Sequence, residues 1–459
     1  MTSRAALVRH PVAIAGAIIA TVFAAVFVAL AIGLLAGLFV RNPYAGLVIF
    51  VAVPALFGAG LLLIPLGMWL ERRRLRLKPE ETAEWPVVDF RRARVRRTVL
   101  AITALTAVNV VILLLAGYGG LHWMESPQFC GQVCHTPMHP QFTAWQQAVH
   151  GRVACAECHI GEGAAGVVRA KLSGVRQLVH VMTNAVPKPI PPGAEMPPGA
   201  QAETCLACHQ PGRASGDHIR IIREYADDEK NTETMTVLQM HLGKSSSSPR
   251  AIHWHADPAV RVEYVATDAE RQTIPYVRVT DAKGQIKEYR AADAPDQAVS
   301  AGTRRMDCVD CHNTVGHPIA ATPEQAVDRA LAAMPDPSKL PFARREGVRL
   351  VKASYPSQDD ARRAIDSELR KFYQSRKDSP GTGDAALART VAAVQAAYSH
   401  NVFPPMKVTF GSYPDNRGHV TSNGCFRCHD DSHVAKDGSK ISGDCEYCHT
   451  QIERPEGSP

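Results

Sequence analysis

The sequence predicts three membrane-spanning helices at the amino terminus, followed by a mostly α-helical domain with little regular secondary structure and a small β insertion. Three observations predict this fold. Three long apolar runs occupy most of the first 118 residues, and six copies of a short cysteine–histidine motif are spread through the remainder. Between the third and fourth copies, polar and apolar residues alternate as they do in strands.

The three apolar runs are each long enough to cross a bilayer. They cover Pro11–Val40, Ala45–Leu70 and Val99 to about Tyr118, and a transmembrane helix needs roughly 20 apolar residues. The first run is too long for a signal-peptide core, and no small-residue cleavage site stands out before Arg41. We therefore expect an uncleaved membrane anchor.

The basic residues near these runs predict how the chain crosses the membrane. Residues 1–118 carry 13 Lys/Arg against 5 Asp/Glu, whereas the rest of the chain is nearly neutral, with 38 against 39. Ten of the basic residues lie between the second and third runs, which marks that loop as cytoplasmic. The amino terminus is then cytoplasmic, and everything after the third span lies on the periplasmic side of a bacterial inner membrane. The basic surplus is a topology signal, so no nucleic-acid partner is expected.

All 12 cysteines fall in six pairs, and a histidine follows each pair directly. Five motifs read C-x-x-C-H, and the first has one extra residue between its cysteines. Two thioethers must meet the vinyl groups of a porphyrin, and the next residue places an imidazole under the iron, so the spacing indicates covalent haem attachment. The motifs are Cys130/Cys134/His135, Cys155/Cys158/His159, Cys205/Cys208/His209, Cys308/Cys311/His312, Cys425/Cys428/His429 and Cys445/Cys448/His449.

Two other uses of cysteine pairs explain the pattern less well. Zinc ribbons need the pairs two at a time and require no histidine directly after each pair. A disulfide framework gives no reason for six repeats of one local motif. The sequence therefore predicts a multihaem cytochrome c with six covalently attached haem c groups. Aromatic residues make up only 6% of the chain, so we expect the porphyrins to supply part of the core.

The first motif stands close to the third span. Only 11 residues separate Gly119 from Cys130. Even a fully extended connection would therefore hold the first haem within about 40 Å of the membrane. A lipid-soluble electron carrier could then reach this haem.

The remaining elements are predicted from periodicity and turn residues. A helix is expected at Val167–Asn184, strands at Arg261–Asp268 and Ile274–Arg290 with a hairpin turn at Asp281–Gly284, and helices at Pro323–Met334, Gln358–Arg376 and Asp384–Ser399. The expected domains are a three-span anchor (1–124), a four-haem domain (125–320) with a β-containing insertion at about 210–305, a helical segment (321–418) and a carboxy-terminal two-haem segment (419–459).

The 19 histidines far exceed the six that follow the cysteine pairs. Electron-transfer haems usually take a second His or a Met as the other axial ligand. Met138 follows Cys134 by four residues and is an option for the first haem. The four histidines that stand near a motif are the favoured distal ligands: His150, His317, His419 and His433. His122, with Trp123, is expected to be an interfacial anchor. The other histidines of the exported part stay open as ligands or as core or solvated residues: His139, His180, His218, His241, His253, His255 and His400.

Several of these stretches resemble the NapC/NirT family of membrane-anchored multihaem quinol dehydrogenases. Phe129-Cys-Gly-Gln-Val-Cys-His-Thr-Pro-Met138 looks like the first haem site of that family. His150-Gly-Arg-Val-Ala-Cys155-Ala-Glu-Cys158-His159 matches its second site, and Cys308-Val-Asp-Cys311-His312-Asn-Thr-Val-Gly-His317 its fourth. Together these stretches cover roughly residues 119–320.

The resemblance implies site residues that the spacing alone does not. It makes Met138, in place of His135, the candidate ligand of the first iron. A lysine and an acidic residue on the helix after the second motif flank the quinol in this family. Lys171 and Arg176 fall in the corresponding region, and Gln177 stands at the acidic position. The chain departs from simpler members of the family in having three spans, six haems and a long insertion. It is closer to the family's extended inner-membrane cytochromes.

The function expected on these grounds is oxidation of menaquinol or another quinol, with transfer of electrons to a periplasmic redox protein or reductase. The membrane quinol pool would be the source of electrons, and a homo- or hetero-oligomer in the membrane is possible. One alternative is a terminal reductase of nitrite, hydroxylamine or a metal ion, which needs a substrate-accessible iron. Another is a docking subunit that only passes electrons within a larger respiratory complex.

Overall fold

The structure is a computed structural model that describes residues 10–36, 45–76, 90–133, 135–160, 163–192, 204–209, 216–243, 251–292, 294, 302–336, 340–376 and 384–453. The chain separates into two compact units, Met1–Val133 and Cys134–Pro459. The predicted turn Arg41–Tyr44, Cys134 and the side chain of His135 lie outside the described residues.

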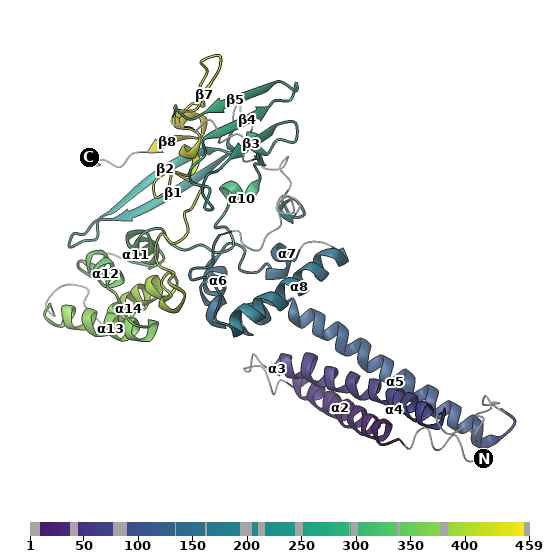
Figure 1. The fold of residues 1–459 in the computed structure, drawn as a ribbon. Helices are drawn as coiled ribbons and strands as arrows, with labels where there is room; N and C mark the ends of the chain where they lie inside the picture. Colours follow the sequence, from purple (N-terminus) through teal and green to yellow (C-terminus); the bar gives the residue numbers. More distant parts are fainter. Residues whose placement is uncertain are drawn as a thin grey trace. The chain divides into compact units, whose positions relative to one another are not determined.

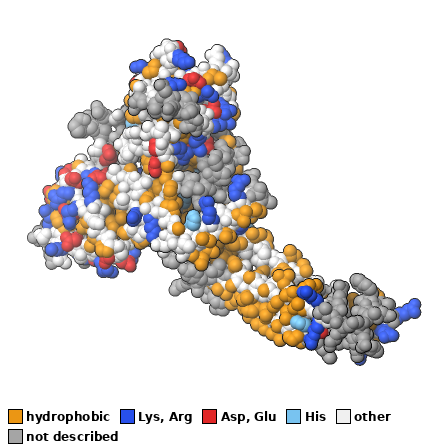
Figure 2. All heavy atoms as spheres, viewed as in Figure 1, with side chains coloured by type: hydrophobic (Ala, Val, Ile, Leu, Met, Phe, Trp, Pro, Cys, Tyr) orange, Lys and Arg blue, Asp and Glu red, His pale blue; other side chains and the backbone are white. Residues whose placement is uncertain are grey.

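The first unit consists of three helices that are long and apolar enough to cross a membrane, as predicted. α2 is Pro11–Leu35. The second begins with α3 (Ala45–Leu47) and a π-helical stretch η1 (Val48–Ala52) and continues as α4 (Val53–Arg76). α5 is Ala93–Met124 and extends beyond the predicted apolar run at both ends. Figure 2 shows hydrophobic side chains covering the visible face of this unit.

α2 and α4 pack closely because small residues line their interface. A methyl group added at Gly60 would lie 2.6 Å from the backbone nitrogen of Ala20, and one at Gly16 would lie 2.7 Å from the carbonyl oxygen of Gly60. A methyl group at Gly67 would overlap the backbone of Ala13. Helices in a bilayer gain little from apolar burial against one another, so close backbone approach of this kind stabilises their association.

α5 is held at its carboxy-terminal end by aromatic side chains. The Phe50 and Trp123 rings lie 6.5 Å apart, and Trp123 meets Phe129 edge-on at 4.7 Å. Side chains larger than hydrogen at Gly46 or Gly119 would overlap Trp123 or Phe50. The first unit therefore has a defined end, from which the chain continues into the first cysteine motif.

The second unit begins with helices that carry or adjoin the second motif. α6 is His135–Gln147, α7 is Cys155–His159 and α8 is Gly163–Met182. α8 corresponds to the predicted helix Val167–Asn184 and begins four residues earlier. The short helix α10 (Cys308–Cys311) and the 3-10 turns η8 (Gly424–Arg427) and η9 (Cys445–Tyr447) carry residues of later motifs.

Two antiparallel sheets follow α8 along the chain (Figure 1). The first sheet has the order β1-β2-β8 and the second β6-β3-β4-β5-β7. The predicted hairpin is present: β4 and β5 are joined by a turn in which the N–H of Gly284 donates to the carbonyl of Asp281 at 2.9 Å, with Gly284 at φ +78°. The strands are β1 (Asp217–Tyr225), β2 (Glu233–His241), β3 (Arg261–Val265), β4 (Tyr276–Thr280), β5 (Ile286–Arg290), β6 (Arg304–Arg305), β7 (Val434–Ala435) and β8 (His449–Glu453).

The carboxy-terminal segment takes part in both sheets. β8 pairs with β2, and β7 pairs with β5. The residues predicted as a separate two-haem segment (419–459) therefore share sheets with the β insertion, and 134–459 forms one compact unit. Strands that pair across 144 to 216 residues of sequence give no local signal.

Four helices form the largest apolar core of the second unit. They are α11 (Pro323–Ala332), α12 (Ala343–Lys352), α13 (Gln358–Gln374) and α14 (Asp384–Ser399). Their core includes Val327, Leu331, Ile365 and Leu369, all fully buried. α11 begins at a Thr322 cap with Pro323 next, and α13 at a Ser357 cap followed by two aspartates, which are favoured residues at helix starts. α12 was not predicted.

Candidate functional site

The first cysteine of the first motif belongs to the membrane unit. Phe129–Val133 form a single π-helical turn, η2, which contains Cys130. The hydroxyl of Ser126 donates to the carbonyl of Trp123 (2.7 Å) and accepts from the N–H of Phe129 (3.2 Å). The N–H of Cys130 donates to the carbonyl of Ser126 at 3.2 Å. These bonds fix Cys130 six residues beyond the end of α5.

Five of the six motif histidines face a second histidine. The distance between the two ring centroids is close to 6 Å in every case, although the partners come from distant parts of the chain. The pairs are His159 with His317 (6.1 Å), His209 with His150 (5.9 Å), His312 with His253 (6.2 Å), His429 with His255 (5.8 Å) and His449 with His419 (6.1 Å).

This separation fits a metal held between two imidazoles. Bonds of about 2 Å from one metal to two ring nitrogens place the ring centroids about 6 Å apart. Aromatic rings in direct contact lie anywhere between about 4.5 and 7 Å apart, so the indication of a metal comes from the same separation recurring in all five pairs. Among the described residues, no group of three or more His, Cys, Asp or Glu side chains could hold a metal ion. The paired rings therefore fit the two axial positions of haem iron.

Hydrogen bonds orient several of these rings. Nδ1 of His317 donates to the carbonyl of Gln141 (2.9 Å), and Nδ1 of His255 donates to that of Ile252 (2.8 Å). Nδ1 of His429 donates to the carbonyl of Ser442 at 2.8 Å. In the described part of the chain, no hydrogen bond reaches Nε2 of these three rings. A backbone bond at Nδ1 fixes the tautomer and leaves Nε2 as the metal-binding nitrogen.

Burial keeps many of the paired rings neutral. It lowers the pKa of His159, His317, His312, His253 and His255 below the usual range. A metal ligand must be deprotonated at the coordinating nitrogen, so the neutral form is the one that binds iron.

Two other histidines have both ring nitrogens engaged. His433 is 2% exposed; its Nδ1 lies 2.9 Å from Oδ1 of Asp430, and its Nε2 donates to the carbonyl of Ile274 at 2.7 Å. His241 contacts Asp217 and Thr450, each at 3.1 Å. Three of the four predicted distal candidates, His150, His317 and His419, thus lie opposite a motif histidine. The fourth, His433, is instead held by hydrogen bonds at both ring nitrogens.

His253 and His255, which pair with the fourth and fifth motifs, were not among the favoured candidates. Both lie on one 3-10 turn, η4 (Ile252–Ala256), on either side of Trp254. The close repeat His-Trp-His is the only sequence signal for this arrangement. Their partners lie 59 and 174 residues further along the chain, so proximity in sequence could not find them.

The motifs also approach one another in sequence order. The thiols of Cys205 and Cys308 are hydrogen-bonded, and Cys158 lies near Cys205 and Cys208. Cys311 and Cys448 each lie near Cys425. Motifs two to six therefore form a continuous series in which each neighbours the next.

The first motif is described only in part. Met138 lies on α6 and is half-buried. The neighbouring His139 meets Phe403 edge-on, with the ring centroids 5.1 Å apart.

α8 is an amphipathic helix with an exposed apolar stripe. At 3.6 residues per turn, the apolar residues at 168, 172, 175, 179 and 182 line one face. Lys171 and Arg176 flank this stripe on opposite sides, whereas Gln177 points away from it. The helix has no acidic residue. The stripe residues and their exposed fractions are Val168 (59%), Leu172 (68%), Val175 (62%), Val179 (50%) and Met182 (78%).

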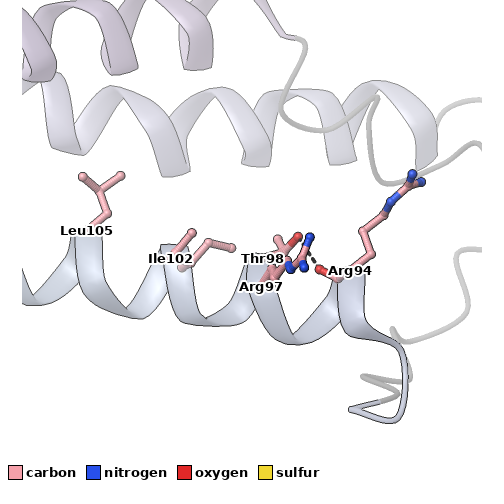
Figure 3. Close-up of a pocket in the computed structure, with 6 residues that line it drawn as sticks. Arg94, Arg97, Thr98, Ile102 and Leu105 are labelled. Atoms are coloured by element: carbon pink, nitrogen blue, oxygen red, sulfur yellow. Dashed lines mark hydrogen bonds between the residues drawn. The ribbon is translucent and has the colours of Figure 1, made fainter.

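An open groove along α5 lies far from the first motif (Figure 3). Its lining includes Arg94, Arg97 and Leu105, and the hydroxyl of Thr98 donates to the carbonyl of Arg94 at 3.0 Å. Leu105 is separated from the end of α5 by roughly 30 Å of helix. The groove therefore has no part in the chemistry of the cysteine motifs.

Comparisons with known proteins agree with this arrangement. The family model described as "NapC/NirT cytochrome c family, N-terminal region" matches residues 92–189. The chain is 37% identical over 422 residues to the cytochrome c-type protein ImcH of Geobacter sulfurreducens, covering 90% of this chain and 82% of ImcH. It is 26% identical over 167 residues to the cytochrome c-type protein Cgr1 of Eggerthella lenta, covering 34% of this chain and 54% of Cgr1. No solved structure matches it.

The apolar helices, the cysteine motifs and the full-length similarity to ImcH lead to one assignment. The chain belongs to the NapC/NirT cytochrome c family and is a membrane-anchored multihaem cytochrome that transfers electrons.

Proposed function

We propose that this cytochrome oxidises a membrane quinol, such as menaquinol, and passes the electrons through six haem c groups to a periplasmic acceptor. The observation that carries the proposal is the position of Cys130, six residues beyond the end of α5 and inside the membrane unit. A haem attached there is within reach of a carrier dissolved in the lipid. The amino terminus lies in the cytoplasm and the haem domain in the periplasm, as the basic loop predicts.

The axial ligands follow from the ring pairs. We assign His317, His150, His253, His255 and His419 as the distal ligands of haems two to six. Met138 remains the proposed ligand of the first iron, in place of His135. Two histidines would be available to each of five haems, so a terminal reductase would have to act at the first haem alone. This distribution favours electron transfer over reduction of a bound substrate.

The chain's own residues would bind the quinol, hold its oxygen and stabilise that oxygen as its proton leaves. The haems supply one-electron redox chemistry, whereas a quinol releases two electrons and two protons. An exposed apolar stripe flanked by basic side chains, as on α8, is typical of helices that bind a membrane interface, and we expect Lys171 and Arg176 to meet the headgroups there. Their positive charges hold the quinol oxygen and stabilise it as its proton leaves to the periplasmic side. Gln177 faces away from the stripe, and we leave it out of the quinol site.

The series of neighbouring motifs supports a linear path. The six motifs would hold the haems in a series along which electrons could pass from the first to the sixth. The haems would supply one-electron steps, so that the two electrons of a quinol could leave one after the other. The acceptor then docks near the carboxy-terminal motif.

The test is reduction of the haems by menaquinol in membrane vesicles that contain the full-length cytochrome. We expect reduction that a quinone-site inhibitor blocks. Lys171→Met should lower its rate at least tenfold while haem content and reduction by dithionite stay unchanged. Gln177→Ala is the matched control and should keep the rate. Absence of menaquinol reduction in the wild-type protein with all haems attached would reject the proposal.

A further inference from the structure

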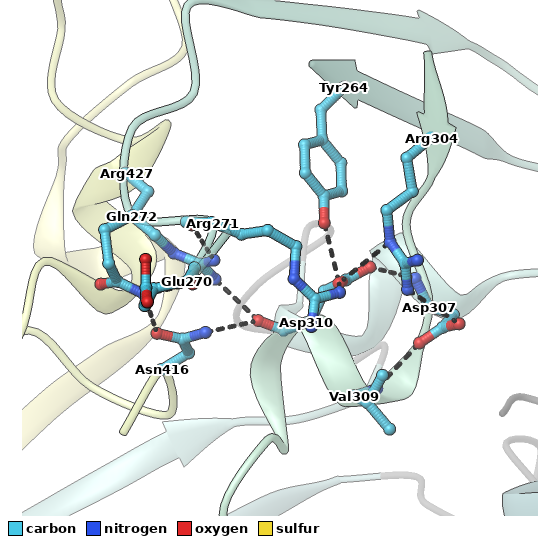
Figure 4. A network of polar contacts seen from close by, with 10 residues as sticks. All are labelled: Tyr264, Glu270, Arg271, Gln272, Arg304, Asp307, Val309, Asp310, Asn416 and Arg427. Carbon is cyan, nitrogen blue, oxygen red and sulfur yellow. Dashed lines mark hydrogen bonds and ion pairs between the residues drawn. The ribbon is translucent and has the colours of Figure 1, made fainter. Parts of the chain in front are cut away.

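A buried group of charged residues joins the fourth and fifth motifs (Figure 4). Asp310 stands directly before Cys311, and Arg427 directly before Cys428. The Asp310 side chain is 1% exposed, and Arg427 is 8% exposed. Residues between the two attachment cysteines lie beside the porphyrin that those cysteines hold. The charges of both residues therefore act at short range on the haems.

Asp310 is fully engaged by donors. Its Oδ1 accepts from the hydroxyl of Tyr264 (2.8 Å) and from Nη1 of Arg271 (2.7 Å), and it lies 3.4 Å from Nε of Arg304. Its Oδ2 accepts the backbone N–H of Asp307 at 2.9 Å. The negative charge of Asp310 is thus matched by two guanidinium groups.

Among the described residues, the hydrogen bonds of Arg427 all go to carbonyl oxygens. Its three nitrogens donate to the carbonyls of Gly424 (2.7 Å), Arg271 (2.9 Å) and Asp310 (2.7 Å). Carbonyl groups are dipoles without net charge, so they orient the guanidinium and leave its charge in place. The last two bonds also tie the fifth motif to the fourth and to the loop before β4.

Glu270, which Figure 4 also draws, is exposed, and the remaining charged groups of the cluster carry a net positive charge. Arg271, Arg304 and Arg427 contribute three guanidinium groups, and Asp310 and Asp307 contribute two carboxylates, with Arg304 and Asp307 3.6 Å apart. In a protein interior a charge is screened far less than in water. A buried positive charge beside a haem stabilises the ferrous iron over the ferric iron, which has one more positive charge.

We propose that this cluster raises the reduction potentials of the fourth and fifth haems, so that the pair retains electrons in the middle of the chain. The inference rests on the proposed attachment of haems at these two motifs, and it deepens the proposed electron path. Each iron takes one electron from its neighbour, ferric to ferrous, with no change in protons or bonds. Arg427 and Asp310 act here through the haems as positioning and tuning residues.

The first experiment compares a variant that removes a positive charge with a variant that removes a negative charge. Arg304→Gln removes a positive charge and keeps the bonds of Arg427. Asp307→Asn removes a negative charge, and asparagine caps α10 as well as aspartate does. The midpoint potentials of the detergent-solubilised holoprotein are measured by spectroelectrochemical titration. Burial raises the pKa of Asp307, so the titration is run at about pH 8 to keep its carboxyl group ionised. Arg363→Gln, on α13 with a side chain 72% exposed, is the control.

We expect one or two of the six haem components to move to lower potential in Arg304→Gln and to higher potential in Asp307→Asn. The control should match the wild type. Shifts of the same sign in both variants, equal shifts of all six components, or no shift would overturn the proposal. Haem content is counted by mass spectrometry in each case. A wild-type chain without haem at the fourth and fifth motifs would instead reject the proposed function.

A second comparison separates the effect of the Arg427 charge on the potentials from the effect of its hydrogen bonds. Arg427→Lys keeps the positive charge but cannot make all three carbonyl bonds, whereas Arg427→Met loses both. The proposal expects the methionine variant to lower one or two potentials and the lysine variant to stay near the wild-type values. Equal shifts in the two variants would make Arg427 a purely structural residue. If Arg427→Met does not assemble with six haems, the Arg304 and Asp307 variants decide the question alone.

Discussion

At the scale of single residues, the sequence marks the six motifs directly, whereas it pointed to only three of the five histidines that the structure places opposite a motif histidine. A cysteine pair and its following histidine are set by the shape of one porphyrin, so local spacing is enough. A distal histidine is set by the tertiary fold. His433 stands as near to its motif as other candidates do, yet its Nε2 is taken by the carbonyl of Ile274, before β4. His255 reaches His429 from 174 residues away.

Replacement of His255 tests this difference. We expect His255→Ala to leave one of the six irons five-coordinate and to produce a high-spin absorption band that is absent in the wild type. His433→Ala is the control. It should give no high-spin band but should lower the free energy of unfolding by about 1–3 kcal/mol, because two buried hydrogen-bond partners are left unsatisfied. A high-spin band in His433→Ala but not in His255→Ala would make His433 the distal ligand and His255 the structural residue.

His400 gives the helical core a pH dependence of known sign. It follows α14, and burial lowers its pKa below the usual value of about 6.5. The unfolded chain therefore binds the proton more readily than the folded chain, and stability decreases as the pH falls below about 6.5, by at most about 1.4 kcal/mol per pH unit. Hydrogen exchange of the α14 amides, corrected for intrinsic rates, should accelerate at pH 5. His400→Gln should remove this acceleration, and an unchanged profile in that variant would contradict the assignment.

At the scale of elements, apolar runs and turn residues predicted the spans, the β4–β5 hairpin and three of the four core helices. α12 was missed because six of its ten residues are polar or glycine and no side chain caps its start. Phe342, which precedes it, lies at φ +59°. The β1–β2 hairpin was missed because exposed and half-buried residues dominate both strands, and its third strand, β8, comes from the end of the chain.

Two glycines of α4 give a matched test of helix packing in the membrane. Gly60 faces the backbone of α2, whereas a methyl group at Gly58 would meet nothing within 4 Å. We expect Gly60→Ala to destabilise the α2–α4 pair by about 1–3 kcal/mol, because the helices must separate to admit the methyl group. Gly58→Ala should be neutral or slightly stabilising. Unfolding in mixed micelles measures both. Equal effects at the two positions would contradict the packing.

At the scale of the whole molecule, the described residues of the second unit form one large apolar core, mainly from the side chains of α11–α14, and two smaller ones. The low aromatic content therefore limits side-chain packing less in the helices α11–α14 than in the haem-bearing segments. The helices α11–α14 bury leucine, isoleucine and valine against each other, and the haem-bearing segments depend on short helices and turns. The sequence predicted that the haem region needs haem to fold. It did not predict that the helices α11–α14 form a core of their own beside the haem-bearing segments.

Protein made without haem attachment should reveal the separation. We expect limited proteolysis of such protein to degrade the haem-bearing segments and to leave a resistant fragment containing residues 323–406. The holoprotein should resist proteolysis across both regions. Mass spectrometry of the fragments provides the measurement. Uniform degradation of the haem-free chain would mean that the helical core also requires the cofactor to fold.

The turn η4 has a consequence for how the protein responds to strain. One short loop places a histidine opposite the histidine of each of two successive motifs, and Trp254 stands between the two in sequence. If haems are held at these motifs as proposed, any displacement of that loop would act on both irons at once. The two sites would then be mechanically coupled, and a partner that pulled on this loop would disturb both in the same instant.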